Sequence, residues 1–184
     1  MKNTILLTLV IAGLLFVVSC TDNSPGDLIK ESSKKYVDET LNHKTDYHNK
    51  RIALEGFIYP KETTDVKAGV VTLEISTQPK SGGDNLADVE ISLGEGKNEV
   101  IMPTQGEGKD VIYKTTQYEI DESKLKFIDN EGNQHPITDK VRLSGTVKYV
   151  DHFEGGFSHI PDPMNKGKEI YPFVLKDVRI DPVK

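Results

Sequence analysis

The residues best suited to chemistry lie in one segment near the end of the chain, at 151–169. Two imidazoles and a carboxylate fall close together there, at His152, Glu154 and His159. Imidazole nitrogen and carboxylate oxygen together suit zinc and similar ions, so these side chains are candidate metal ligands. Their spacing matches no known ligand signature, and the alternative is that both histidines are simply solvated. The sequence leaves the choice between a metal site and a solvated loop open.

The same segment carries aromatic side chains that indicate a different role. Long loops with aromatic residues often carry binding functions, and His152, Phe153, Phe157 and His159 form a candidate ligand-binding set. In the competing interpretation Phe153, Phe157 and Ile160 cap the mouth of the domain core and no ligand is involved. Either way, the segment is expected to be a long connection between two strands.

Elsewhere the chain lacks the residue patterns of known catalytic centres. It has no Gly-x-Ser-x-Gly elbow and no His-Glu-x-x-His helix, and its single cysteine, Cys20, directly follows an apolar N-terminal run and Ser19. Acidic pairs such as Asp121 and Glu122 are adjacent in sequence, and such neighbours do not face each other on a helix or strand. We therefore predict that the protein is not an enzyme.

Two further patterns resemble ligand-binding loops but favour turns. The sequence Gly-Glu-Gly-Lys occurs at 94–97 and again at 106–109, without the spacing or the terminal Lys-Ser/Thr of a phosphate-binding loop. Residues 127–133 hold Asp129 in a setting that suggests a calcium loop, but no bidentate Glu follows at the required distance. A strand entering a tight hairpin turn is the favoured interpretation there.

The elements that must position these residues are mainly strands. Apolar and polar residues alternate over 51–58, 71–76, 89–93, 141–150 and 171–180, which predicts five strands. Gly56 and Gly145 predict bends in two of them, and a phase slip at 176–177 predicts a bulge. Before the strands, residues 27–42 predict a helix with Ser24 available as its N-cap.

A leading helix and about five strands, two of them bent at glycine, fit a small closed barrel. We predict a mainly β, OB-fold-like five-stranded barrel preceded by an N-terminal α-helix. The domain would span 27–184, with an insertion at about 94–140. In OB-folds the usual binding surface is the face of the second and third strands, whose outward residues here are Thr72, Glu74, Ser76, Glu90 and Ser92.

That predicted face makes nucleic acid an unlikely partner. It is acidic and has no aromatic platform, whereas single-stranded nucleic acid is bound by stacked aromatic residues in a basic groove. The whole chain has a formal charge of −6, which becomes −7 when Lys2 is removed with the leader described below. Polyanions draw affinity from lysine and arginine, so this charge opposes their binding.

Several segments resemble the OB-fold lipoproteins and related exported proteins grouped as tRNA_anti-like. The resemblance rests on the leading helix, on a connector ending at 47–51 and on the strands at 52–56, 141–147 and 173–180. Together they cover about half of the exported chain. The resemblance implies an OB-fold barrel but specifies no ligand.

The first residues read as a secretory signal. An apolar run from Ile5 to Val18 follows Lys2 and is too short for a membrane span, since a spanning helix needs about 20 apolar residues. The sequence Val-Val-Ser-Cys at 17–20 resembles the lipobox of bacterial lipoproteins. We therefore expect residues 1–19 to be a signal peptide, Cys20 to be the first residue of the mature protein and 20–26 to be a tether.

The lipobox resemblance implies a covalent diacylglycerol on the Cys20 thiol and an acyl chain on the freed amine, with no other cofactor. Each buried methylene contributes about 0.8 kcal/mol, so several chains hold a protein firmly on a membrane. Asp22 stands one place away from the inner-membrane retention position, which favours the outer membrane and leaves the face open. The expected protein is an anchored envelope module that binds a protein, peptide or small ligand, or else a metal through the loop at 151–169.

Overall fold

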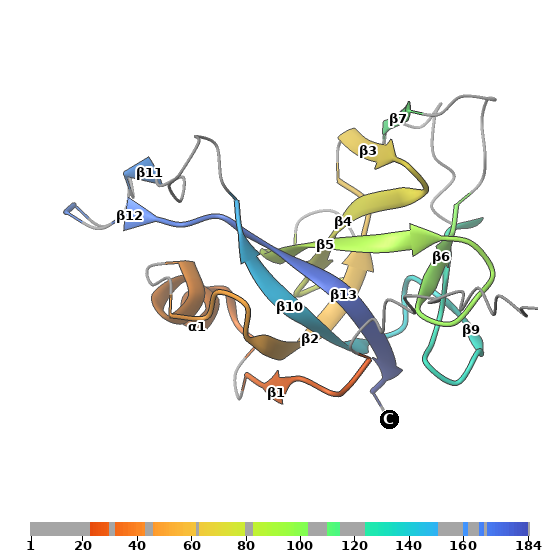
Figure 1. The fold of residues 1–184 in the computed structure, drawn as a ribbon, viewed down its shortest axis with the longest axis horizontal. Helices are drawn as coiled ribbons and strands as arrows, with labels where there is room; N and C mark the ends of the chain where they lie inside the picture. Colours follow the sequence, from red (N-terminus) through yellow and green to blue (C-terminus); the bar gives the residue numbers. More distant parts are fainter. Residues whose placement is uncertain are drawn as a thin grey trace, which may run out of the picture.

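A computed structural model describes the protein over residues 23–29, 32–42, 46–61, 63–79, 83–102, 110–114, 124–150, 160–161, 166–167 and 169–183. Figure 1 shows a barrel of strands flanked by a short helical segment and by smaller hairpins. The predicted signal peptide at 1–19 and the lipidation site Cys20 lie outside the described residues, as do the loop residues 151–159.

Five strands close into the barrel. They are β2 (Arg51–Tyr59), β4 (Val70–Ser76), β5 (Asn85–Leu93), β10 (Val141–Tyr149) and β13 (Phe173–Pro182). Hydrogen bonding runs β4–β2–β10–β13–β5 and returns from β5 to β4, which closes the ring. The pairing of β13 with β5 is parallel, and the other four are antiparallel. The predicted OB-fold-like barrel is confirmed, and all five predicted strands belong to it.

The two glycines predicted to mark bends stand where neighbouring strands come close. β2 pairs with β10 as far as Gly56 and with β4 from Phe57 onward, so it changes partner at the glycine. A Cβ on Gly56 would lie 2.5 Å from the carbonyl oxygen of Ser76, and one on Gly145 would lie 2.9 Å from Leu175 Cβ. No side chain fits at such distances, so these positions require glycine.

The inward side chains of the barrel strands form one hydrophobic core. Fully buried members include Ile52, Leu54, Leu73, Val89, Leu143 and Leu175. Burying one such side chain stabilises a fold by about 1.5–3 kcal/mol. The only cysteine is Cys20, so the barrel has no internal disulfide and depends on this core.

The N-terminal helix is shorter than the prediction of 27–42. It consists of α1 (Lys34–Val37), followed by a π-helical turn, η1 (Asp38–Asn42). Its N-cap is Ser33 rather than Ser24, because the Ser33 hydroxyl accepts a hydrogen bond from the N–H of Tyr36 at 3.3 Å. The predicted helix start was therefore wrong by about two turns.

The residues expected to open that helix pair with the barrel instead. β1 (Asp27–Leu28) runs parallel to the first half of β2. The Ser32 hydroxyl accepts a hydrogen bond from the N–H of Glu55 at 2.8 Å, which holds the chain against β2. Serine hydroxyls compete with helical hydrogen bonding, and the free edge of β2 offered this segment more partners than an isolated helical turn.

The segment at 94–140 adds strands at both ends of the sheet order, with one beside the strand that precedes β4 and the other three beyond β5. It contains β6 (Glu99–Ile101), β7 (Asp110–Lys114), β8 (Lys126–Ile128) and β9 (Gln134–Pro136). β6 pairs in parallel with the end of β5 and antiparallel with β8, which forms a hairpin with β9. The hairpin predicted from 127–133 is therefore confirmed. β7 pairs with β3 (Thr63–Lys67), which precedes β4 (Figure 1).

A small two-stranded sheet lies in the connection between β10 and β13. It is formed by β11 (Ile160–Pro161) and β12 (Glu169–Ile170). Beyond β12 the N–H of Tyr171 donates to the carbonyl of Asn42 at 2.6 Å, so this connection is fastened to the end of the helical segment.

Candidate functional site

The barrel wall opens between β5 and β13. Their parallel pairing covers two residue pairs and ends at Val89 and Leu175. β5 then takes a different neighbour, since Ser92 pairs with Glu99 of β6. The two strands that close the barrel thus separate soon after they meet, and a gap forms between them.

A bulge in β13 borders this gap. Between Ser144 and Thr146 the register of β10 against β13 shifts, so that Gly145 faces an extra residue of β13. Asp177 lies in the bulge with φ +53°, a left-handed conformation that aspartate tolerates better than most residues. The bulge predicted from the phase slip at 176–177 is confirmed, and it lies just beyond the last residue pair that joins β13 to β5.

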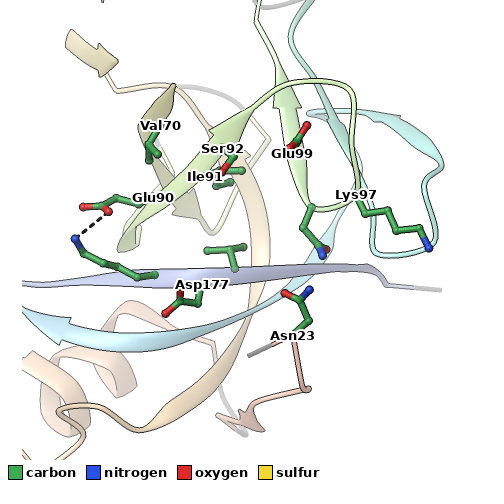
Figure 2. A pocket seen from close by; sticks show the side chains of 11 residues that line it. Asn23, Val70, Glu90, Ile91, Ser92, Lys97, Glu99 and Asp177 are labelled. Carbon is green, nitrogen blue, oxygen red and sulfur yellow. Dashed lines mark ion pairs between the residues drawn. The ribbon is translucent and has the colours of Figure 1, made fainter. Parts of the chain in front are cut away.

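A polar groove of about 340 Å³ occupies the gap. Figure 2 shows Glu90 on β5, Asp177 on β13, Lys97 on the turn after β5 and Asn23 below β13. The dashed line marks the ion pair across the groove, in which Lys176 Nζ lies 2.9 Å from Glu90. Both side chains are about one third exposed or more, so the pair contributes at most about 1 kcal/mol and can rearrange around a ligand.

Asn98 fixes the end of the groove. Its side-chain oxygen accepts a hydrogen bond from the N–H of Ile180 at 2.8 Å, which satisfies the edge of β13 beyond the bulge. Its own N–H donates to the carbonyl of Ile128 at 3.0 Å, and its φ of +60° places it in a tight turn. The first Gly-Glu-Gly-Lys repeat is therefore part of a structural turn, as predicted, and Asn98 joins it to β13.

Two charged residues of this turn border the groove differently. The Glu99 carboxylate accepts a hydrogen bond from the N–H of Gly96 at 2.6 Å and so belongs to the turn. Lys97 is exposed, and among the described residues no carboxylate forms an ion pair with it. Lys97 therefore offers a cation to a ligand without breaking an existing interaction.

A second cavity of about 400 Å³ continues beyond the Glu90–Lys176 pair, which borders both cavities. His48 and Tyr149 line its far wall, with ring centroids 6.0 Å apart. The Tyr149 hydroxyl donates to the carbonyl of Leu41 at 2.9 Å, and burial raises the pKa of Tyr149 to about 12. The Tyr149 side chain therefore stays protonated near neutral pH and lines the cavity without acting as an acid or a base.

The outer face of β4 and β5 is acidic, as predicted. Glu74 and Asp88 lie directly opposite each other, and Lys61 Nζ forms an ion pair with Asp88 at 2.6 Å. Burial and the Asp88 carboxylate raise the pKa of Glu74. Ser76 was expected to face outward and is instead buried, because the turn after β4 folds over it and the Gln78 N–H approaches its hydroxyl.

A separate buried cluster holds the β8–β9 hairpin. Asp129 is fully buried and accepts hydrogen bonds from three turn amides and from His135 Nε2. Burial raises the pKa of Asp129, but these hydrogen bonds outweigh it and hold the pKa well below its usual range. For His135 burial acts in the opposite direction and lowers the pKa, but hydrogen bonds to Asp129 and Asp139 outweigh it and raise the pKa overall. The polar groups of this cluster are hydrogen-bonded to one another, so the cluster stabilises the hairpin and we describe it as a structural lock.

The candidate metal ligands His152, Glu154 and His159 and the aromatic residues Phe153 and Phe157 fall outside the described residues, as does Cys20. Within the described ranges, no three His, Cys, Asp or Glu side chains come together as a metal site. Over the same ranges, the structure contains no helix of the length and apolarity that a membrane crossing requires.

Sequence reasoning named Glu90 and Ser92 of the groove but missed the part played by Asn23, Lys97, Asn98 and Lys176. The one available signal was the phase slip beside Lys176, which predicts a bulge without showing what the bulge separates.

Comparison of the chain with protein-family models, with curated proteins and with solved structures gives no match.

Proposed function

We propose that the protein is a lipid-anchored envelope lipoprotein whose OB-fold-like barrel is a non-enzymatic binding module, akin to the tRNA_anti-like group. Cys20 would carry the diacylglycerol and acyl chains, and the outer membrane is the proposed location. The observation that supports a binding role is the polar groove between β5 and β13. It adjoins the face of the second and third barrel strands, where OB-folds usually bind their ligands.

The groove suits a polar ligand that carries both signs of charge. Its volume of about 340 Å³ lies within the usual range for small-molecule sites. Lys97 presents a cation, and the Glu90–Lys176 pair can exchange its internal contact for contacts to a ligand. A headgroup, a small zwitterion or a segment of an envelope peptide has this chemistry, whereas a polyanion would meet the acidic face of β4 and β5.

Mass spectrometry and membrane fractionation test the proposed anchor. Mass spectrometry of the protein extracted from membranes should find a mature N-terminus at Cys20 carrying diacylglycerol and acyl groups, and Cys20→Ser should leave the membrane fraction. An intact Met1 or an unmodified thiol would refute the anchor.

Binding is tested by photo-crosslinking in intact cells from a reactive residue at Ser92, which is exposed in the groove wall. The matched control position is Asp84, which is exposed just before the start of β5. We expect a discrete adduct from Ser92 alone that weakens in a Glu90→Gln, Lys176→Gln double variant. Adducts that ignore both position and variant would contradict binding in the groove.

A further inference from the structure

The chain enters the barrel beside the groove and is fixed there. Arg179 Nη1 donates to the carbonyl of Asn23 at 3.2 Å, and Arg51 Nε donates to the carbonyl of Ser24. Both arginines are held in turn, since Arg179 forms an ion pair with Asp181 at 2.8 Å and Arg51 Nη1 donates to the carbonyl of Asp177 at 2.7 Å. The N-terminal segment is therefore fastened to the barrel wall from Asn23 onward.

This attachment leaves little chain for a tether. In the proposed function Cys20 carries the lipid, and Asn23 follows three residues later. An extended chain spans at most about 3.6 Å per residue, so Asn23 lies within about 11 Å of the anchored residue. The sequence analysis expected the tether to reach residue 26, and the contacts of Asn23 and Ser24 shorten it by half.

So short a tether limits how the barrel can turn. A domain of about 160 residues has a radius of gyration of about 15 Å, so its far side lies more than about 30 Å from any point on its surface. Placing that far side on the bilayer would require a tether about three times longer than the one available. The side on which Asn23 is fastened therefore stays close to the membrane in the proposed anchored protein.

We propose that the face around Asn23, with the groove that this residue lines, is the membrane-facing surface of the protein. Its partner is the headgroup layer of the bilayer, which it meets with exposed Lys97 and the Glu90–Lys176 pair. The phosphate groups of phospholipids complement the lysines of this face, and their amine groups complement Glu90. In this orientation the groove would bind its ligand at the surface of the bilayer. This inference rests on the proposed lipidation of Cys20.

The test compares Ser92, near the end of β5, with Asp84, which directly precedes the start of β5. Ser92 is exposed in the groove, and Asp84 is exposed eight residues earlier, which is about 25 Å away at roughly 3.3 Å per residue. Lipidation blocks the sulfur of Cys20, so Ser92→Cys or Asp84→Cys introduces the only free thiol. Each full-length processed variant is labelled with a small fluorophore and reconstituted in phosphatidylcholine vesicles containing a lipid with a nitroxide on its headgroup.

We expect nitroxide quenching several-fold stronger for the Ser92→Cys label than for the Asp84→Cys label. Equal quenching, or stronger quenching from Asp84→Cys, would overturn the orientation. A matched variant with about ten Gly and Ser residues inserted after Asp22 keeps the lipid but lengthens the tether, and should lose the difference. A difference that survives the insertion would also overturn the argument, because tether length would then not set the orientation.

Mass spectrometry of the same samples separates the two levels of the proposal. A sample without lipid on Cys20 shows that the proposed anchor is wrong, and the orientation falls with it. A sample with the lipid in place but without a difference in quenching shows that the anchor is right and the orientation is wrong.

Discussion

Replacement of Asp129 tests what holds the β8–β9 hairpin together. Its Oδ1 accepts hydrogen bonds from the N–H groups of Glu131, Gly132 and Asn133 at 2.8, 2.8 and 2.9 Å, and Oδ2 lies 2.9 Å from His135 Nε2. Asp129→Ala removes the acceptor for all three amides. Asp129→Asn keeps a neutral oxygen for them and replaces Oδ2 with an N–H₂ group.

The two variants should lower the free energy of unfolding by different amounts. A hydrogen bond to a charged group contributes about 1.5–3 kcal/mol, and a neutral one contributes about 0.5–1.5 kcal/mol. The three amides share one oxygen, so their contributions are not additive, and water recovers part of the loss in a surface turn. We therefore expect Asp129→Ala to lower the free energy of unfolding by about 4 kcal/mol and Asp129→Asn to lower it by about 2 kcal/mol.

Urea unfolding followed by far-UV circular dichroism measures both losses, since the chain has no tryptophan to follow by fluorescence. The matched control is Asp139→Asn, because Asp139 is half exposed and contacts only the outer nitrogen of His135. A loss below about 1 kcal/mol for Asp129→Ala would refute the account of the hairpin as a buried lock. Equal losses for the alanine and asparagine variants would show that the charge matters and the acceptor geometry does not.

Further predictions concern pH and backbone geometry. Burial lowers the pKa of His135, but its hydrogen bonds to Asp129 and Asp139 raise the pKa overall. The protonated imidazole therefore contributes its full stabilisation of the fold below the ordinary histidine pKa of 6.5, and this contribution is lost as pH rises through the pKa of the folded state. Urea midpoints should thus fall as pH rises above about 6.5 and fall less in His135→Gln; parallel profiles would exclude this titration as the cause. Gly145→Ala should cost about 2–3 kcal/mol, because its methyl would lie 2.9 Å from a Cβ on β13, and an unchanged thermal midpoint would count against that close approach. Ala68→Asn should stabilise the protein by about 0.5–1 kcal/mol, since Ala68 and Gly69 form a turn with φ +51° and +78° that favours Asn-Gly; a lower thermal midpoint would contradict this.

The barrel was predictable because each of its strands has an alternating apolar and polar pattern that can be recognised locally. Residues of period two mark β2, β4, β5, β10 and β13 locally, and one buried face fixes the register of each strand. Gly56 and Gly145 were informative because glycine within a strand has few reasons other than a bend or a close approach. The start of the helix was not predictable, because the apolar pair Leu28 and Ile29 suits either a helix or an edge strand.

The groove depends on contacts that no local pattern contains. Asn23, Lys97 and Lys176 are far apart in sequence and come together beside the gap that opens where β13 and β5 stop pairing. The bulge itself was predictable from the phase slip, but its consequence depends on β6 replacing β13 as the neighbour of β5. Periodicity reports which side of a strand is buried and says nothing about which strand lies at its edge.

The separation of β5 from β13 also explains why the insertion lies where it does. A barrel closed by a short parallel contact leaves backbone edges on both strands, and exposed edges invite unwanted pairing. β6 covers the edge of β5, while the Asn98 side chain accepts the N–H of Ile180 and the Asn130 N–H donates to the Ile180 carbonyl at 2.8 Å. The turns around the insertion thereby supply hydrogen-bond partners for backbone groups at one end of the gap. At Glu90 and Lys176 the two strands are joined by a side-chain ion pair. A groove bounded in this way can exchange its side-chain contacts for a ligand while the backbone of the barrel stays paired.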